Sequence, residues 1–294
     1  MSGILPFYVV GPTGSGKSDF AEALARVTEG EIVNADAYQI YRGLPILTAC
    51  PSLPAREEIP HHLYEVLPPD QPCDAGRYLD LALPILSGIA ARGKLPIVTG
   101  GSGLYIKALT HGLNEAPASD PALRRQLDQL SRGELAQLLG RFDPASAASI
   151  EPRNRRYIQR AVEISLLVGK PASSLRQAWT ADPPELRGVC LVRPREELHE
   201  RIRRRTLAML RLGAIDEVRS VTSWSATSAK AIGVAEIQRL LADEISESEC
   251  VEAMAMATRR YAKRQMTWFR REKWLTPVTG ETSAIEIATA ANLL

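Results

Sequence analysis

Residues 11–18 could bind phosphate. They read Gly-Pro-Thr-Gly-Ser-Gly-Lys-Ser, which fits the pattern G-x-x-x-x-G-K-[ST], and they follow the apolar run 6–10. Glycines let several backbone N–H groups point into one concavity, and the helix that follows adds its positive end. Lys17 would reach the outer phosphates and Ser18 would hold Mg²⁺. The alternative is a glycine-rich turn with an incidental lysine. The predicted phosphate-binding residues are Gly11, Pro12, Thr13, Gly14, Ser15, Gly16, Lys17 and Ser18.

Asp36 is the second candidate for chemistry. P-loop NTPases usually carry a metal-binding Asp at the end of an apolar strand, but the run 95–99 continues into Gly100-Gly101-Ser102. Asp36 instead ends the run 31–35. Because ligands of parallel sheets bind at the carboxyl ends of the strands, Asp36 should lie at the same edge as the phosphate loop. It could bind the metal, act as a general base, or cap a helix.

Basic residues cluster at three further places. Arg201 and Arg205 are four residues apart and share a helix face, so they could clamp a diphosphate, although a solvated basic face is the alternative. Four arginines lie within 153–160 and could grip an RNA backbone. The segment 259–273 has seven Lys/Arg and one acid. Aromatic residues are interleaved in it, and they favour either base stacking or, more often, core packing: Tyr261, Trp268, Phe269 and Trp274.

Two adjacent histidines, His61 and His62, do not indicate a metal site. Neighbouring residues do not share a helix face, so we interpret both as structural.

Short apolar runs alternate with helical periodicity, which predicts a doubly wound parallel sheet of the α/β class. The predicted strands are 7–10, 31–35, 95–99 and 189–192, with 274–278 as a possible fifth. Helices are expected over 16–28 and 78–92, and two long ones over 196–221 and 248–271.

The alternation stops near residue 114. The stretch 114–186 has no strand signal, and Asp120-Pro121 and Asp143-Pro144 are typical helix starts, with helical periodicity again over 153–168. We therefore predict a P-loop core domain made of 1–113 and 187–294, with a small all-helical insertion domain at 114–186.

The amino-acid composition limits the class of protein and the cellular compartment to be expected. The chain has 294 residues, 45% hydrophobic and 24% charged, as expected of a soluble globular protein, and its net charge of +2 does not by itself indicate nucleic-acid binding. No apolar run of membrane-spanning length and no secretory leader pattern occur. The four cysteines are widely spaced, which disfavours structural zinc and fits a reducing cytoplasm. We expect a monomer that does not contact membranes.

Several segments together resemble the bacterial tRNA isopentenyltransferase family, the tRNA dimethylallyltransferases. The similarity covers nearly the whole chain and is carried by GPTGSGKS, NADAYQIYRGLPILTACP, IPHHLYEVLPP, GKLPIVTGGSGLYIKAL, RRYIQRAVEI, PREELHERIRRRTLAML and TRRYAKRQMTWFR. The phosphate loop alone is generic. Its combination with D-x-x-Q-x-Y, G-G-[ST]-x-L-Y and K-R-Q-x-T-W is specific.

The resemblance implies transfer of a dimethylallyl group from its diphosphate to N6 of the adenosine immediately 3′ of the anticodon in tRNA. It implies that residues 13–18 hold the diphosphate with Mg²⁺, that Asp36 accepts the N6 proton, and that Arg205 stabilises the leaving diphosphate. Lys17 would contribute to that catalysis. Binding to the tRNA anticodon stem-loop is implied for Asp36, Ala37, Tyr38, Gln39, Ser102, Arg124, Arg156, Tyr157, Ile158, Gln159 and Arg160.

The chain departs from the family pattern at several positions. Ala37 stands where a serine is usual, Leu47 and Cys50 stand in a segment that usually reads D-I-G-T-A-K-P, and Val234 replaces a tyrosine. Two other interpretations remain open. A small-molecule P-loop kinase would bind ATP and need a lid, and an RNA-binding protein without activity would keep the loop only as a remnant.

Overall fold

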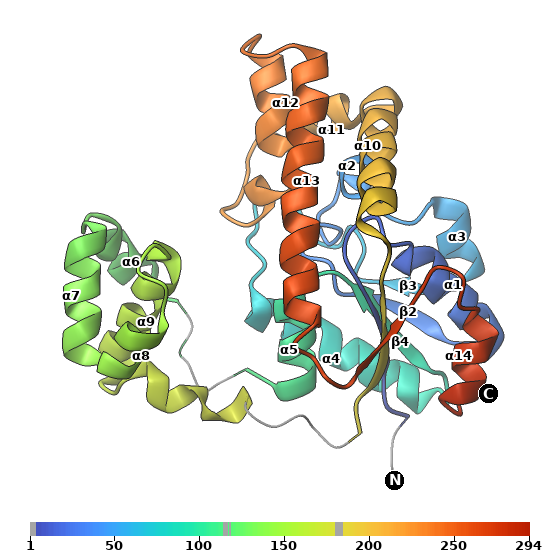
Figure 1. Ribbon diagram of the computed structural model, residues 1–294, viewed down its shortest axis with the longest axis horizontal. Helices are drawn as coiled ribbons and strands as arrows, with labels where there is room; N and C mark the ends of the chain where they lie inside the picture. Colours follow the sequence, from blue (N-terminus) through green and yellow to red (C-terminus); the bar gives the residue numbers. More distant parts are fainter. Residues whose placement is uncertain (1–3, 114–116, 118, 180–184) are drawn as a thin grey trace. The chain divides into compact units, whose positions relative to one another are not determined.

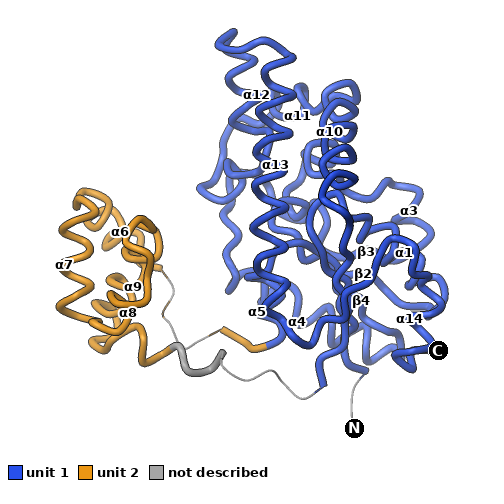
Figure 2. The backbone as a smooth tube through the Cα atoms, in the orientation of Figure 1, with its two compact units in different colours: residues 1–110, 184–294 blue, residues 111–183 orange. Residues whose placement is uncertain are grey.

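The computed structural model describes residues 4–113, 117, 119–179 and 185–294, and it divides into two compact units. One unit comprises 1–110 and 184–294, and the other comprises 111–183 (Figure 2). The domain boundaries predicted from sequence were 113/114 and 186/187. Residues 114–116, at the first predicted boundary, lie outside the described residues.

A six-stranded parallel sheet forms the centre of the larger unit (Figure 1). Its strands are β1 (Phe7–Val10), β2 (Glu31–Asn34), β3 (His61–His62), β4 (Pro96–Gly100), β5 (Arg187–Leu191) and β6 (Leu275–Val278). They are ordered β3-β2-β4-β1-β5-β6. The predicted α/β class and all five predicted strands are confirmed, whereas the two-residue strand β3 was not predicted because it is too short for periodicity to mark.

Side chains of the central strands alternate between two hydrophobic cores, as the pleat requires. Tyr8 and Val10 of β1 belong to one core, and Phe7 and Val9 belong to the other. Both faces of the strand are therefore buried, which explains its continuous apolar sequence.

Helices cover both faces. The second core contains residues of α1 (Lys17–Thr28) and α14 (Ala284–Ala290), and the first contains residues of the other long core helices. The remaining helices of this unit are α2 (Pro45–Thr48), α3 (Leu53–Glu58), α4 (Ala75–Ala91), α5 (Gly103–His111), α10 (Arg195–Leu212), α11 (Ala214–Ser220), η2 (Ser228–Lys230), α12 (Val234–Leu241) and α13 (Glu247–Phe269).

The prediction of one helix over 196–221 was wrong. The chain forms α10 and α11, separated by Gly213, whose φ of 113° lies in the left-handed region that glycine favours. A single glycine within a periodic pattern can end a helix without changing the apolar spacing, so periodicity alone did not reveal the break.

The smaller unit is helical throughout its described part. It contains α6 (Pro121–Asp128), α7 (Arg132–Phe142), α8 (Pro144–Ser149), α9 (Arg155–Val168) and η1 (Ala172–Trp179). The side chains of Asp120 and Asp143 accept backbone N–H bonds at the starts of α6 and α8, which confirms both predicted helix starts. Leu135, Leu139 and Val162 centre its own core.

No helix among the described residues is long and apolar enough to cross a bilayer.

Candidate active site

The phosphate loop lies between β1 and α1, the context that its sequence predicted. Gly14 and Gly16 have φ values of 84° and 91°, and Lys17 is the first residue of α1. A side chain at Gly11 would place its Cβ 2.8 Å from the Leu191 carbonyl oxygen, so the loop passes close to the end of β5. The loop therefore lies at the carboxyl edge of the sheet and at the N-terminus of α1, which is where a phosphate-binding loop is expected.

Three arginines hold this loop from outside. Arg193 Nε donates to the Ser15 carbonyl oxygen at 2.7 Å, and Arg201 Nε donates to the Gly14 carbonyl oxygen at 2.8 Å. Arg205 donates to the Thr13 hydroxyl. The alternative of a solvated basic face is therefore wrong for Arg201 and Arg205. Arg193 was not predicted, because it precedes the helix and shares no spacing with the other two.

Lys17 and Arg205 are half-buried cations with a nearby carboxylate, Asp36. The pKa of Lys17 is lowered to about 8, mainly by burial, which Asp36 opposes and Arg205 reinforces. Burial also lowers the pKa of Arg205, which Asp36 again opposes. The cluster therefore carries more positive than negative charge in a desolvated place, and an anion would relieve that imbalance.

Asp36 caps a turn rather than a helix. Its Oδ1 accepts the Tyr38 N–H at 3.0 Å, and its own N–H donates to Asn34 Oδ1 at 2.8 Å. The next helix is α2, which begins only at Pro45, so the helix-cap alternative is wrong. One carboxylate oxygen is engaged in the turn, and the other faces Gly101, lying 3.6 Å from where a Cβ on that glycine would be.

Glycines at the end of β4 and at the start of α5 allow close packing. A Cβ on Gly100 would lie 2.2 Å from the Ala35 carbonyl, and one on Gly103 would lie 2.4 Å from the Trp268 ring. Thr99 accepts the Ala35 N–H at 2.7 Å, and Ala35 accepts the Ser102 N–H at 3.2 Å. The ends of β2 and β4 are therefore joined, which places Asp36 next to this loop.

Gln265 of α13 connects the two loops. Its Oε1 accepts the Thr13 N–H at 2.8 Å, and its Nε2 donates to the Gly101 carbonyl oxygen at 2.9 Å. The Thr13 amide is thus already bonded within the protein. Gln265 was not predicted as a site residue. The available signal was its place on a buried stripe with Thr258, Ala262 and Phe269, where a lone glutamine must find polar partners.

The aromatic residues of the basic segment 259–273 and Trp274 pack in the core, as the sequence favoured, with the exception of Tyr261. Phe269 is buried in the main core, and Trp268 and Trp274 pack against it. Tyr261 instead lies near Asp36, and its ring centroid is 6.0 Å from that of Tyr38. Burial raises the pKa of Tyr261, as do Asp36 and Tyr38.

Residues 39–272 match the sequence model of the IPP transferase family. The chain belongs to this family. A tRNA dimethylallyltransferase from Akkermansia muciniphila is 44% identical over 290 residues, covering 99% of this chain and 98% of that protein. A tRNA dimethylallyltransferase from Anaeromyxobacter dehalogenans is 43% identical, with 92% of each chain covered.

Solved structures of IPP transferases agree. The tRNA delta(2)-isopentenylpyrophosphate transferase of Staphylococcus epidermidis has a TM-score of 0.69 and 32% identity, covering 98% of this chain and 99% of that one. A eukaryotic dimethylallyltransferase described as acting on tRNA has a TM-score of 0.80 and 26% identity, covering 93% of this chain and 73% of that one.

The residues predicted to contact the acceptor base lie in or near the turn that follows β2. Ala37 and Tyr38 are half-buried there, and Ser102 is half-buried at the start of α5. The Gln39 side chain holds the backbone at the end of α2, because its Nε2 donates to the Thr48 and Ala49 carbonyl oxygens at 3.1 and 2.8 Å.

The predicted tRNA contacts of the insertion lie on α6 and α9. Arg124, Arg156 and Tyr157 are exposed, while Gln159 and Arg160 are half-buried. Ile158 is only 2% exposed and packs in the core of the insertion, so its side chain does not face a ligand.

The positions that depart from the family pattern are packed. Leu47 is 4% exposed and would meet a Cβ on Gly233 at 2.6 Å, so these two residues fit each other. The Cys50 thiol points toward the Gln39 carbonyl oxygen at 3.7 Å.

His61 and His62 are structural, as interpreted from sequence. His61 Nδ1 is 2.7 Å from the Ile59 carbonyl oxygen, and His62 Nε2 is 2.8 Å from Glu31 Oε2.

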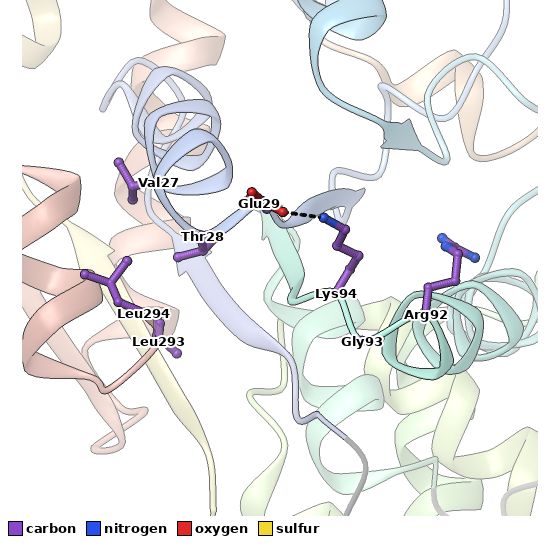
Figure 3. A pocket seen from close by; sticks show the side chains of 8 residues that line it. All are labelled: Val27, Thr28, Glu29, Arg92, Gly93, Lys94, Leu293 and Leu294. Atoms are coloured by element: carbon purple, nitrogen blue, oxygen red, sulfur yellow. Dashed lines mark hydrogen bonds and ion pairs between the residues drawn. The ribbon is translucent and has the colours of Figure 1, made fainter.

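A separate hollow lies away from the phosphate loop. It has a volume of about 560 Å³, lies at the other end of α1 and is lined by Val27, Thr28, Glu29, Arg92, Gly93, Lys94, Leu293 and Leu294 (Figure 3). Its charged members Glu29 and Lys94 pair with each other at 2.7 Å, so it offers a ligand little unpaired charge.

Proposed function

We propose that this chain transfers a dimethylallyl group from dimethylallyl diphosphate to N6 of the adenosine immediately 3′ of the anticodon in tRNA. The observation that carries the proposal is the pair of half-buried cations, Lys17 and Arg205, beside the carboxylate of Asp36. The pair offers charge to a leaving diphosphate, and the carboxylate offers a proton acceptor to an attacking amine. Relatives matching 99% and 92% of the chain are named tRNA dimethylallyltransferases.

The transfer needs no nucleophile from the protein. The adenine N6 forms a bond to the allylic C1, the C1–O bond breaks, and diphosphate leaves with that electron pair. The phosphate loop, Lys17 and Arg205 stabilise the departing charge. Asp36 takes the proton that N6 loses, through the carboxylate oxygen that faces Gly101. An unpaired anticodon-loop base can leave its stack at low energetic cost and enter the pocket.

Mg²⁺ fits the residues present. The described residues contain no group of three His, Cys, Asp or Glu that could form an all-protein metal cage. Mg²⁺ commonly binds through one protein oxygen, substrate phosphates and water, and Ser18 on the first turn of α1 supplies such a hydroxyl. Bound there, the ion would neutralise charge on the diphosphate.

The partners are thus the tRNA anticodon stem-loop and dimethylallyl diphosphate, and we propose a cytoplasmic monomer. All four cysteines are free thiols, which accords with a reducing compartment.

The test is mass spectrometry of nucleosides from tRNA incubated with the chain, Mg²⁺ and dimethylallyl diphosphate. Dimethylallyl-adenosine should appear, and omission of the diphosphate should abolish it. Parallel calorimetry with ATP separates the kinase alternative: tight ATP binding without nucleoside modification would contradict the proposal.

A further inference from the structure

Gln265 is the one side chain of α13 that hydrogen-bonds both loops of the site. It accepts from Thr13 N, 252 residues away, and donates to the carbonyl oxygen of Gly101, 164 residues away. Its side chain is 4% exposed. Both bonds have ordinary lengths, and each satisfies a backbone group that would otherwise be buried without that partner.

The two loops have different tasks under the proposed function. The loop of Thr13 carries the donors for the diphosphate, whereas the loop of Gly101 packs on Ala35 and lies beside Asp36. The separation between these loops therefore sets the separation between the allylic carbon and the residues that receive the acceptor base.

The Gln265 amide approaches the Gly101 backbone closely. A Cβ on Gly101 would lie 2.0 Å from Gln265 Nε2, so a larger residue there would have to displace the amide. Trp268, one turn further along α13, occupies the equivalent place against Gly103. The charged or titratable groups around this point include Asp36 after β2, Lys17 of α1, Arg205 of α10, and Tyr261 and Arg264 of α13. The Tyr261 hydroxyl also interacts with the Gln265 side chain.

We propose that Gln265 is a positioning residue that fixes the distance between the diphosphate-binding loop and the acceptor-base loop. This inference rests on the proposed function. Because the amide bonds backbone groups of the two loops, its loss should affect the alignment of the two bound reactants rather than the binding of either. Misplacement of about 1 Å can cost about 100-fold in rate.

Gln265→Met is the first test, because it keeps the length of the side chain and removes both hydrogen bonds. We expect kcat for dimethylallyl transfer to fall about 10- to 100-fold. The dissociation constants for dimethylallyl diphosphate and for tRNA, each measured alone, should change less than about threefold. A wild-type kcat, or a loss found wholly in either dissociation constant, would overturn the inference.

Thr258→Val is the matched control. Thr258 is also buried on α13, and its hydroxyl bonds only within the helix, to the Met254 carbonyl oxygen at 2.7 Å. This variant should lower the melting temperature without changing kcat. A comparable loss of kcat in the control would show that destabilisation of α13 is sufficient, and the positioning role would be rejected.

Gln265→Glu adds a pH dependence of activity, which would not be expected if Gln265 served only to pack α13. A protonated carboxyl can accept from Thr13 N–H and donate to the Gly101 carbonyl, as the amide does, but a carboxylate cannot donate. The activity of this variant divided by that of wild type should therefore rise as the pH falls. The ratio for Gln265→Met should stay constant. A pH-independent ratio for Gln265→Glu would contradict the role of the Gly101 bond.

Gly101→Ala disturbs the same contact from the other side. Its methyl group must displace the Gln265 amide, so it should reproduce the loss of kcat in the Met variant, and the double variant should lose little more. Additive losses would overturn the inference. If instead the wild-type chain transfers no dimethylallyl group, it is the proposed function that fails.

Discussion

Lys17 should be essential for turnover. Lys17→Ala removes the half-buried cation that, under the proposed function, contacts the departing diphosphate, and losing such a contact should cost about 2.7–4 kcal/mol of transition-state stabilisation. The fold should persist, because the loop is held separately by arginines of the α10 region. Single-turnover rates at saturating diphosphate substrate would measure the effect, and wild-type rates would refute the assignment.

The charge on Lys17 also predicts a pH dependence. Burial lowers its pKa to about 8, so the free protein holds this cation below that pH and loses it above. The affinity for dimethylallyl diphosphate should therefore decrease as the pH rises through about 8. Calorimetry at several pH values would detect the change. The Lys17→Ala variant is the control, since it retains the titration of the ligand but should lack this component.

Asp36→Asn separates the roles that remain for this residue. Asparagine still accepts the Tyr38 N–H, so the turn should survive with a small loss of stability. If Asp36 is the general base, kcat should fall about 10²–10⁴-fold with little change in diphosphate affinity. If it binds Mg²⁺, the Mg²⁺ requirement should rise and diphosphate binding should weaken. Unchanged kcat with a lower melting temperature would leave Asp36 only a turn cap.

At the scale of elements, Glu163 connects α9 to the start of α6 within the insertion. This fully buried carboxylate of α9 accepts from the Ser119 hydroxyl at 2.6 Å, the Asp120 N–H at 3.0 Å and Arg160 Nη1 at 2.7 Å. Arg124 also donates to it. Burial alone would raise its pKa, but the bonds from Ser119 and Arg160 outweigh burial and hold the pKa below its usual value.

Glu163→Gln should therefore destabilise the insertion, by about 1–3 kcal/mol at neutral pH, because the arginines lose their charged partner. A depressed pKa in the folded state contributes stability above the unfolded pKa, and this is lost as the pH falls through the folded value. The difference between wild type and variant should shrink with acidification. Thermal unfolding at several pH values would test this, with the exposed Glu151→Gln as control. A pH-independent difference would contradict the argument.

At the scale of the whole molecule, tRNA binding should weaken steeply with salt although the net charge is only +2. Exposed basic residues are concentrated at 153–160 and 259–273, and each neutralised phosphate contributes about −0.7 to −0.9 to the slope of log K against log salt. Lys263→Gln should reduce that slope by about one contact. Lys94→Gln, at the hollow opposite the phosphate loop, should leave it unchanged. A flat dependence in wild type would show that the clusters do not bind RNA.

Local patterns in the sequence were enough to predict the main strands and helices and the phosphate loop of the site. Buried parallel strands are continuous apolar runs, so β1, β2, β4, β5 and β6 could be recognised without their neighbours. The phosphate loop and the caps Asp120 and Asp143 act on backbone groups within a few residues. Strand β3 was not predicted, because a strand of two residues is too short to show an alternating pattern.

Long-range contacts were decided only by the tertiary structure. Gln265 meets Thr13 across 252 residues, and Arg193 meets Ser15 across 178, while no local pattern marks either pair. The break at Gly213 and the buried role of Glu163 likewise depend on which helices pack together. The spacing of apolar residues in the sequence shows which residues share one face of a helix or strand. Which other element packs against that face is decided by the tertiary fold, in which each buried polar group must also find a hydrogen-bond partner.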